Sequence, residues 1–100
     1  MTIEEYLRSE IRYARKMAKK DEEFRHYNEG LLDGFQDASE YYSLVRVYSD
    51  LYKFLIKELE KTEEKIAENK KYEMFVDYCE GERDAYLFVL DFIKWGRGND

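Results

Sequence analysis

The sequence predicts an all-α protein, an antiparallel up-down bundle of helices, and three observations on its composition support this prediction. The chain of 100 residues contains no proline and only five glycines, so little in it would interrupt a helix. Charged residues make up 40% of the chain, and the Glu and Lys residues that are abundant among them are good helix formers. The hydrophobic fraction of 44% is sufficient for the core of one domain of this length.

The first helix is predicted from about residue 2 to residue 19. Thr2 is a suitable N-cap residue, and Glu4 and Glu5 place negative charge in the first turn, where it is favourable. Apolar side chains then recur every three or four residues, which is the spacing of one helical stripe. The stripe consists of Ile3, Leu7, Ile11, Ala14 and Ala18.

The second helix is predicted from residue 21 to residue 47. Asp21 is its N-cap candidate, and Phe24 begins a new apolar stripe that continues as far as Val45. The charge also changes here, because residues 1–20 hold six basic and three acidic side chains, whereas residues 21–50 hold two basic and eight acidic ones. The basic side chains of the first segment are expected to form a solvated face that pairs with this acidic segment.

The sequence after residue 41 allows two arrangements. Apolar residues keep helical spacing without a break from Tyr41 to Leu59, so the second helix could continue to about residue 60 and a third could restart at Thr62. That arrangement has three helices, two of them very long. Alternatively, Ser49 and Asp50 cap a new helix, which gives four helices, the last two covering residues 50–69 and 71–95.

An internal similarity favours four helices arranged as two helical hairpins. With an offset of 48 residues the first helix aligns with the third, and with an offset of 51 residues the second aligns with the fourth. The second alignment pairs identical residues at Tyr27 and Tyr78, Glu29 and Glu80, Gly30 and Gly81, and Asp33 and Asp84. We therefore expect one helical domain over residues 1–95, with a possible repeat of 2–46 in 50–95, and a flexible tail over 96–100.

The repeated acids are the candidates for a metal site. Glu29 with Asp33, and Glu80 with Asp84, are four residues apart, so the members of each pair share a helix face. Facing pairs could hold Mg²⁺ or Mn²⁺ as in an all-α phosphohydrolase. Measured from Phe75, which we take to mark the core stripe, both acids of the second pair point to solvent, and the first pair lies in the same way relative to Phe24. We therefore expect no metal site and no cofactor.

Small residues recur four apart within the second and fourth predicted helices. A glycine inside a helix costs up to about 1 kcal/mol relative to alanine, so a packing reason is expected. Two helices can approach closely where their facing residues are small. The sequence thus predicts a helix-crossing point at Gly30, Gly34, Gly81 and Ala85.

The stretch from residue 41 to residue 59 carries more apolar surface than one neighbouring helix could cover, if it is one helix. Either the bundle buries it or a second subunit covers it. Its tyrosines favour an interface, because they combine a large apolar area with a polar tip. The predicted interface of a homodimer consists of Tyr41, Tyr42, Leu44, Val47, Tyr48, Leu51, Tyr52 and Phe54.

No set of catalytic residues is recognisable. His26 is the only histidine, Cys79 is the only cysteine, and neither has partners at a motif spacing. We therefore expect a non-enzymatic helical interaction module, a small dimeric adaptor or regulator with an unknown protein partner. The alternatives are an acidic inhibitor that mimics nucleic acid, since the net charge is −6, and the metal-dependent phosphohydrolase.

The surroundings of the protein follow from composition alone. No stretch is long and apolar enough for a membrane span or a signal peptide, so a cytoplasmic protein without membrane partners is expected. Nucleic-acid binding is not expected because the chain lacks a sustained basic face. Abundant Glu and Lys with a single glutamine favour a thermophilic source.

Overall fold

A computed structural model describes residues 1–96 of the chain, which form four α-helices followed by one short π-helix and contain no strand. The all-α, four-helix prediction is confirmed, and the three-helix alternative is wrong. The elements are α1 (Ile3–Lys20), α2 (Arg25–Val45), α3 (Tyr48–Glu68), α4 (Glu73–Asp91) and the π-helix η1 (Phe92–Gly96).

The start of α1 follows the predicted capping pattern. The Thr2 hydroxyl oxygen accepts a hydrogen bond from the backbone N–H of Glu5 at 3.2 Å, and the Glu5 carboxylate accepts one from the backbone N–H of Thr2 at 3.0 Å. This reciprocal capping box satisfies two backbone donors that the first turn leaves without partners. The capping box thereby fixes the N-terminal end of α1.

The second helix begins four residues later than predicted. Asp21 is the C-cap residue of α1, and its carboxylate accepts a hydrogen bond from the backbone N–H of Phe24 at 3.2 Å. The side chain therefore closes the turn between the two helices, and α2 starts at Arg25. Asp21 therefore accepts a hydrogen bond from a backbone N–H as an N-cap residue does, but it lies four residues before the first residue of α2.

The chain turns sharply between α2 and α3, which explains why the three-helix alternative fails. Arg46 adopts a left-handed conformation with φ 51° and ψ 28°, and its backbone N–H donates to the carbonyl of Tyr42. The third helix then begins at Tyr48. Thr62, the expected restart, lies inside α3, where its hydroxyl donates to the carbonyl of Glu58 at 2.8 Å.

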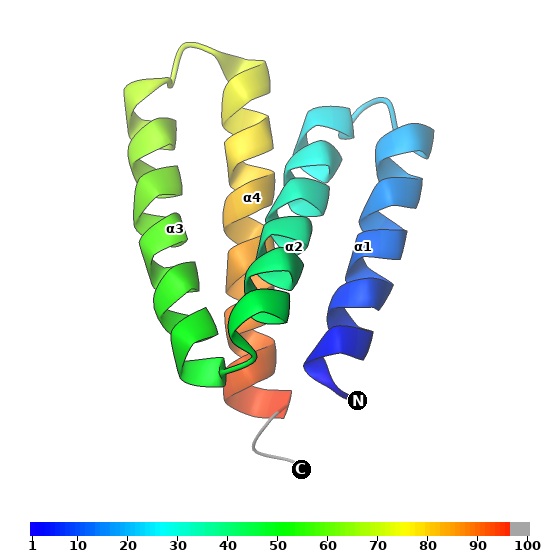
Figure 1. The fold of residues 1–100 in the computed structure, drawn as a ribbon. Coiled ribbons are helices and arrows are strands. Elements are labelled where there is room, and N and C mark those ends of the chain that lie inside the picture. The colour runs from blue at the N-terminus through cyan, green and yellow to red at the C-terminus, as the bar shows by residue number, and fades with distance from the viewer. Residues whose placement is uncertain (97–100) are drawn as a thin grey trace.

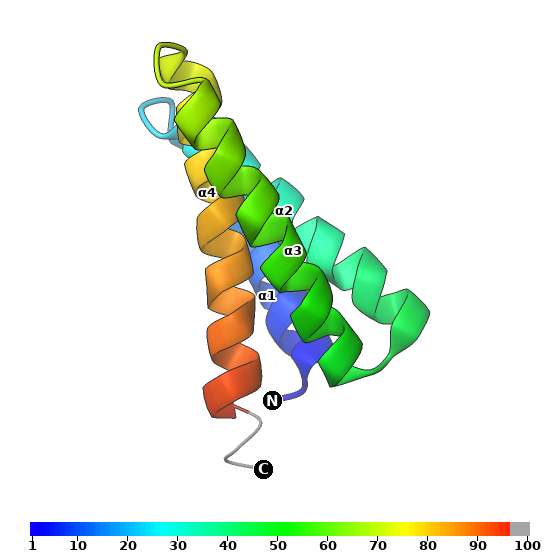
Figure 2. The same ribbon diagram turned by 90° about the vertical axis from the view of Figure 1, so that its left-hand side faces the viewer.

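The two hairpins pack side by side with α2 and α4 at the centre (Figure 1). Both central helices run in the same direction, from the end with the α1–α2 and α3–α4 turns toward the end with the α2–α3 turn. Helix α1 packs mainly on α2 and α3 mainly on α4. Figure 2 shows α2 and α4 diverging toward the α2–α3 turn, so the two helices lie farther apart near the turn than at their crossing.

The core lies along the α2–α4 contact and is closed by α1 and α3. Phe35 and Ala38 of α2 meet Tyr86 and Val89 of α4 in this core. The other buried apolar residues are Ile3, Leu7, Ala14, Leu51, Leu55, Ala85 and Ile93.

The predicted tail begins at Gly96, which is the last residue of η1, and its other residues, 97–100, lie outside the described part of the chain. Across residues 1–96, none of the helices combines the length and the apolar character that a membrane crossing requires.

Candidate functional site

The closest approach in the fold is between α2 and α4, at the glycines that align in the two hairpins. A Cβ atom built on Gly30 would lie 1.9 Å from the carbonyl oxygen of Tyr78, and one built on Gly81 would lie 2.1 Å from the carbonyl oxygen of Tyr27. A Cβ on Gly34 would lie 2.7 Å from the Cβ of Ala85. The structure therefore brings the four predicted small residues together at the α2–α4 crossing, where the two backbones touch.

The contacts at this crossing are reciprocal. The Tyr27 hydroxyl of α2 donates to the Asp84 carboxylate of α4, and the Tyr78 hydroxyl of α4 donates to the Asp33 carboxylate of α2. Burial, with the bonded carboxylate, raises the pKa of Tyr27 to about 12 and also raises the pKa of Tyr78, so both phenols stay protonated as donors. Residues at aligned positions thus make matching contacts, as they would across a two-fold axis.

The predicted direction of the repeated aspartates is wrong. Asp33 and Asp84 face the neighbouring helix and accept the tyrosine hydrogen bonds instead of pointing to solvent. The error comes from the reference residues, because Phe24 is 54% exposed and Phe75 is 42% exposed, so neither marks the core stripe. The interhelical hydrogen bonds give these two acids a role in the crossing.

The repeated glutamates do face outward. Glu29 forms an ion pair with Arg25 at 3.5 Å, and Glu80 lies 4.0 Å from Arg83, each within its own helix. Among residues 1–96 no group of three or more His, Cys, Asp or Glu side chains is arranged to hold a metal ion. The four repeated acids are therefore separated into two exposed glutamates and two bonded aspartates.

The predicted interface residues lie around the α2–α3 turn, and the structure divides them. Tyr41 of α2 stacks on Phe54 of α3, with ring centroids 4.2 Å apart and planes 7° apart. Tyr42 and Tyr48 form a second aromatic pair at 5.7 Å. The apolar excess of residues 41–59 is thus partly covered within the chain, because the stretch folds back on itself.

Other members of the set differ sharply in exposure. Leu51 is fully buried in the core, so its assignment to an interface is wrong. By contrast, Leu44 is 83% exposed, and Val47 and Tyr52 are also exposed. Leu44 and Tyr52 line the grooves on either side of the Tyr41–Phe54 stack, and Val47 adds exposed apolar surface in the α2–α3 turn. We call the stack and these three residues the α2–α3 face.

The balance of charge differs between the two sides of the α2–α3 face. On one side, Tyr41, Leu44 and Phe54 line a shallow groove whose charged residues are all acidic, namely Asp37, Glu40 and Glu58. On the other side, Tyr41, Tyr52 and Phe54 line a groove with three lysines one helical turn apart, Lys53, Lys57 and Lys61. Glu58 also borders this groove and forms an ion pair with Lys61 at 3.4 Å, so the lysines are in excess there but not alone. The aromatic stack therefore separates an acidic groove from a lysine-rich one.

A buried charge lies behind the acidic groove, and sequence reasoning did not identify it. Glu82 of α4 is only 7% exposed, and its Oε1 atom has no hydrogen-bond partner. Burial raises its pKa, opposed by Lys65 of α3 and reinforced by Asp37 and Asp33 of α2 and by Glu58 of α3. Its place between Cys79 and Tyr86 on the buried stripe of α4 was the available signal.

Asp37 is held in the same region by a tyrosine. The Tyr86 hydroxyl donates to its carboxylate at 3.1 Å. Burial raises the pKa of Asp37, and the hydrogen bond from Tyr86 opposes that shift. The acidic groove is therefore continuous with a partly buried polar layer between α2, α3 and α4.

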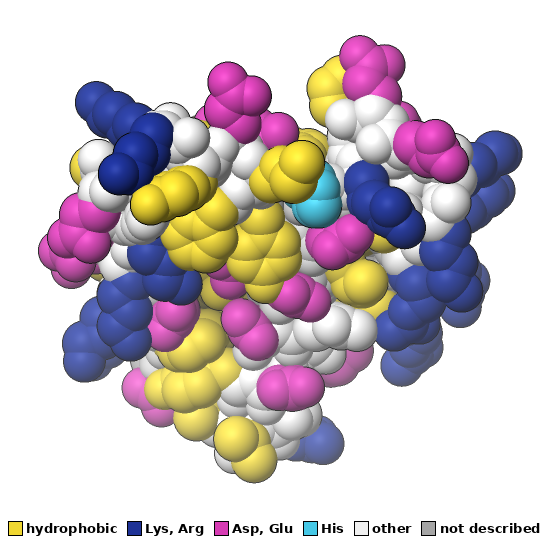
Figure 3. All heavy atoms as spheres, turned by 90° about the horizontal axis from the view of Figure 1, so that it is seen from above, with side chains coloured by type: hydrophobic (Ala, Val, Ile, Leu, Met, Phe, Trp, Pro, Cys, Tyr) yellow, Lys and Arg dark blue, Asp and Glu magenta, His cyan; other side chains and the backbone are white. Residues whose placement is uncertain are grey.

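A second apolar surface lies at the opposite end of the bundle. Figure 3 shows hydrophobic side chains gathered on the end that carries the α1–α2 and α3–α4 turns. Phe24, Tyr72, Met74 and Phe75 are the exposed apolar residues of these turns and of the start of α4. This end and the α2–α3 face are well separated, because they occupy opposite ends of the helices.

No protein-family model, curated protein sequence or solved structure matches this chain. The exposure and the charges of the α2–α3 face are therefore the basis on which a function can be assigned.

Proposed function

We propose that this protein is a non-enzymatic helical interaction module that associates with a second copy of itself through the α2–α3 face. The observation that carries the proposal is the exposure of Leu44, Val47 and Tyr52 around the Tyr41–Phe54 stack. Interfaces are enriched in aromatic residues of this kind, which bury a large area and keep a polar tip in water.

The opposite charge balance of the two grooves favours a second copy as the occupant. In a two-fold dimer the same surface patch meets itself, so it must be complementary to its own rotated image. A two-fold axis through the Tyr41–Phe54 stack would place the lysine groove of each copy against the acidic groove of the other. Opposite charges would then meet twice around one apolar centre, which is the usual arrangement of an apolar core with a polar rim.

The opposite end of the bundle supports the adaptor part of the proposal. In such a dimer the apolar surface with Phe24 and Met74 stays exposed on both copies. A dimer with two free and equivalent ends can engage a partner twice, which raises the overall avidity without any new contact.

Size-exclusion chromatography with light scattering tests the association. We expect a mass of twice the 12.2 kDa chain at high micromolar concentration and a decrease toward one chain mass on dilution. The variant Leu44→Glu should remain monomeric, because it introduces a charge at the centre of the interface. Met74→Glu is the matched control at the other end and should dimerise normally. A wild-type mass of 12.2 kDa at every concentration would refute the proposal.

A charge exchange tests the two-fold arrangement separately. Lys57→Glu places an acid opposite the acidic groove of the other copy and should weaken the dimer about tenfold. The double variant Lys57→Glu with Glu40→Lys should recover most of this loss, because each groove then meets its new complement. Analytical ultracentrifugation at low salt measures both changes. If the double variant were weaker than the single one, the proposed pairing of the grooves would be wrong.

A further inference from the structure

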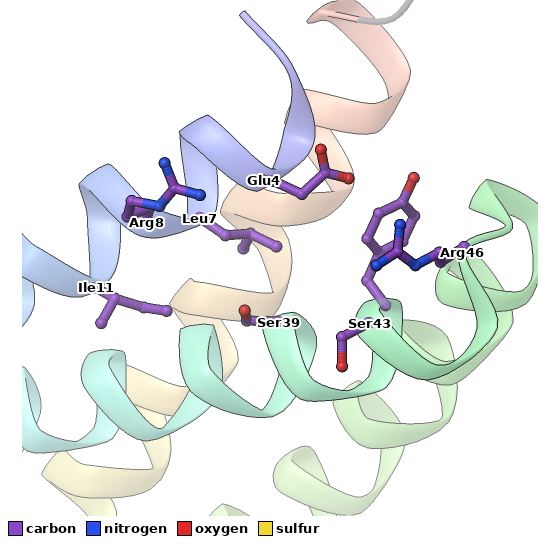
Figure 4. Close-up of a pocket in the computed structure, with 8 residues that line it drawn as sticks. Glu4, Leu7, Arg8, Ile11, Ser39, Ser43 and Arg46 are labelled. Carbon is purple, nitrogen blue, oxygen red and sulfur yellow. The ribbon is translucent and has the colours of Figure 1, made fainter.

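A pocket of about 250 Å³ lies between α1 and the C-terminal half of α2 (Figure 4). Arg8 and Arg46 lie on opposite sides of it, with Glu4 above and the Ser39 hydroxyl pointing in from α2. Leu7 and Ile11 add apolar surface, and Tyr42 and Ser43 complete the lining. Two guanidinium groups and the Ser39 hydroxyl thus border one small cavity, whereas the Ser43 hydroxyl points away from it.

Neither arginine forms an ion pair within residues 1–96, although the charge of Arg8, after the hydrogen bonds with Thr2, contributes to the lowered pKa of Glu5. The four ion pairs formed within residues 1–96 each join residues of a single helix, and none includes Arg8 or Arg46. The expected pairing of the basic first helix with the acidic second one is therefore not found among the described residues. In a chain with 23 acidic side chains, two arginines line one pocket with Glu4 as the only carboxylate in its lining.

The backbone at Arg46 is unusual for an arginine. Its φ of 51° lies in the left-handed region, which glycine adopts more readily than any other residue at the end of a helix. A strained residue that persists in a structure points to a function for its side chain. Here the side chain of Arg46 reaches into the pocket (Figure 4).

The second hairpin provides an internal comparison. Aligned with the offsets of 48 and 51 residues, Arg8 corresponds to Ile56, and Ser39 corresponds to Leu90. Likewise Glu4 corresponds to Tyr52 and Tyr42 to Ile93. The agreement is only partial, because Tyr52 keeps a hydroxyl group and the lining residues Ser43 and Arg46 align with Lys94 and Arg97. Closing a hairpin of this kind therefore needs neither the arginine at position 8 nor the serine at position 39, and packing alone does not explain these two residues.

We propose that this pocket binds a small phosphomonoester that also carries hydroxyl groups. Arg8 and Arg46 would hold the phosphate from two sides, since guanidinium groups match phosphate oxygens in geometry and charge. The Ser39 and Tyr42 hydroxyls would donate to it, whereas the Ser43 hydroxyl already donates to the carbonyl of Glu40 at 2.7 Å. The Glu4 carboxylate can accept a hydrogen bond from a ligand hydroxyl.

The size of the pocket limits the ligand. Clefts that take drug-sized molecules begin at roughly 300 Å³, so a cavity of about 250 Å³ suits a smaller molecule. Leu7 and Ile11 would contact its carbon skeleton. A phosphorylated short polyol satisfies all of these features, and glycerol 3-phosphate is the simplest probe.

Isothermal titration calorimetry at low salt, with glycerol 3-phosphate added to the full chain, tests the proposal. We expect saturable binding at least about tenfold tighter than that of inorganic phosphate. Arg46→Gly should weaken binding at least about tenfold, because it removes charge-assisted hydrogen bonds. The same variant should melt no lower than the wild type, because glycine relieves the left-handed backbone, so lost binding cannot be attributed to misfolding.

Two further variants make the result specific. Arg12→Met removes the same charge from an exposed position of α1 outside the pocket and should change affinity less than twofold. Glu4→Gln should weaken the binding of glycerol 3-phosphate but strengthen that of inorganic phosphate, because Glu4 attracts the hydroxyls and repels the anion.

Three results would overturn the proposal. They are no saturable heat with the wild type, equal losses in Arg12→Met and Arg46→Gly, and equal affinities for glycerol 3-phosphate and inorganic phosphate.

Discussion

At the scale of single residues, the most unusual feature is the buried carboxylate of Glu82. A buried ionised group is costly unless it is paired and fully hydrogen-bonded. Lys65 attracts it, but Asp33, Asp37 and Glu58 all repel it, and its Oε1 atom has no partner. The folded state therefore favours the protonated form of this side chain.

Glu82→Gln should stabilise the protein at neutral pH. The folded-state pKa of Glu82 is raised above its ordinary value of 4.5, so the native state binds more protons than the unfolded state between these two values. The unfolding free energy consequently falls as the pH rises through this window, so the cost of burying the carboxylate grows toward neutral pH. We expect a gain of about 1–2 kcal/mol at pH 7, on the order of 5–10 °C in Tm.

Thermal melts of the wild type and Glu82→Gln from pH 7 to pH 4.5 provide the measurement. The gain should shrink steadily as the pH falls, because the wild-type carboxyl becomes protonated. Glu80→Gln, two residues away on the same helix but exposed, should change Tm little at any pH. Destabilisation by Glu82→Gln across the whole range would mean that the attraction to Lys65 outweighs the burial.

At the scale of the helices, the sequence predicted the existence and order of the elements better than their faces. Proline-free stripes with helical spacing predicted the helices, the internal similarity favoured four of them over three, and the capping pattern at Thr2 located the start of α1. The α2–α3 turn was ambiguous because it depends on Arg46, a residue type with no turn preference in a left-handed conformation. Local sequence does not encode such a turn, which the surrounding packing stabilises.

The candidate site was predictable only in part, again because the sequence predicted the helices better than the faces that they bury. Recurrent small residues indicated a close crossing, and the structure places Gly30 and Gly81 against backbone there. The direction of Asp33 was wrong because one exposed aromatic was taken as core, and a rotation of the stripe moves every side chain of the helix with it. The burial of Leu51 could not be predicted because it depends on a turn that the pattern did not fix.

Gly30→Ala should be strongly destabilising. The added Cβ would meet the carbonyl oxygen of Tyr78 at 1.9 Å, and backbone cannot move aside as a side chain can, so α2 and α4 must separate. Overpacking of this kind costs about 3 kcal/mol. Gly34→Ala should cost less, since its closest contact at 2.7 Å is the methyl group of Ala85. Urea unfolding followed by circular dichroism measures both changes.

Because Gly30 and Gly81 face each other's helices, a double variant provides a second test. Once Gly30→Ala has separated the helices, Gly81→Ala meets less resistance, so the double variant should lose clearly less stability than the sum of the two single ones. Additive losses would indicate that the two glycines lie at independent contacts, in disagreement with the crossing described above.

At the scale of the whole molecule, the two hairpins make matching contacts at the α2–α4 crossing and differ elsewhere. The crossing keeps matching contacts at aligned positions, with Tyr27 bonded to Asp84 and Tyr78 bonded to Asp33. Away from the crossing the halves differ, because α1 and α2 enclose a pocket lined by Arg8 and Ser39, whereas the aligned residues of α3 and α4 are Ile56 and Leu90. The shared region stabilises the fold, and the surfaces that differ are where function is expected.

The proposed dimer predicts that thermal stability depends on both protein concentration and salt. Association stabilises the folded state by mass action, so Tm should rise as the concentration increases from about 1 to about 100 μM. The rise should be smaller at 1 M salt, where the screening length falls to about 3 Å and the grooves attract each other less. Differential scanning calorimetry of the wild type and of Leu44→Glu measures both dependences. The variant should melt at one temperature at all concentrations, because Leu44 is exposed in the single chain and its replacement affects only association. A concentration dependence that survives in Leu44→Glu but disappears in Met74→Glu would move the interface to the other end of the bundle.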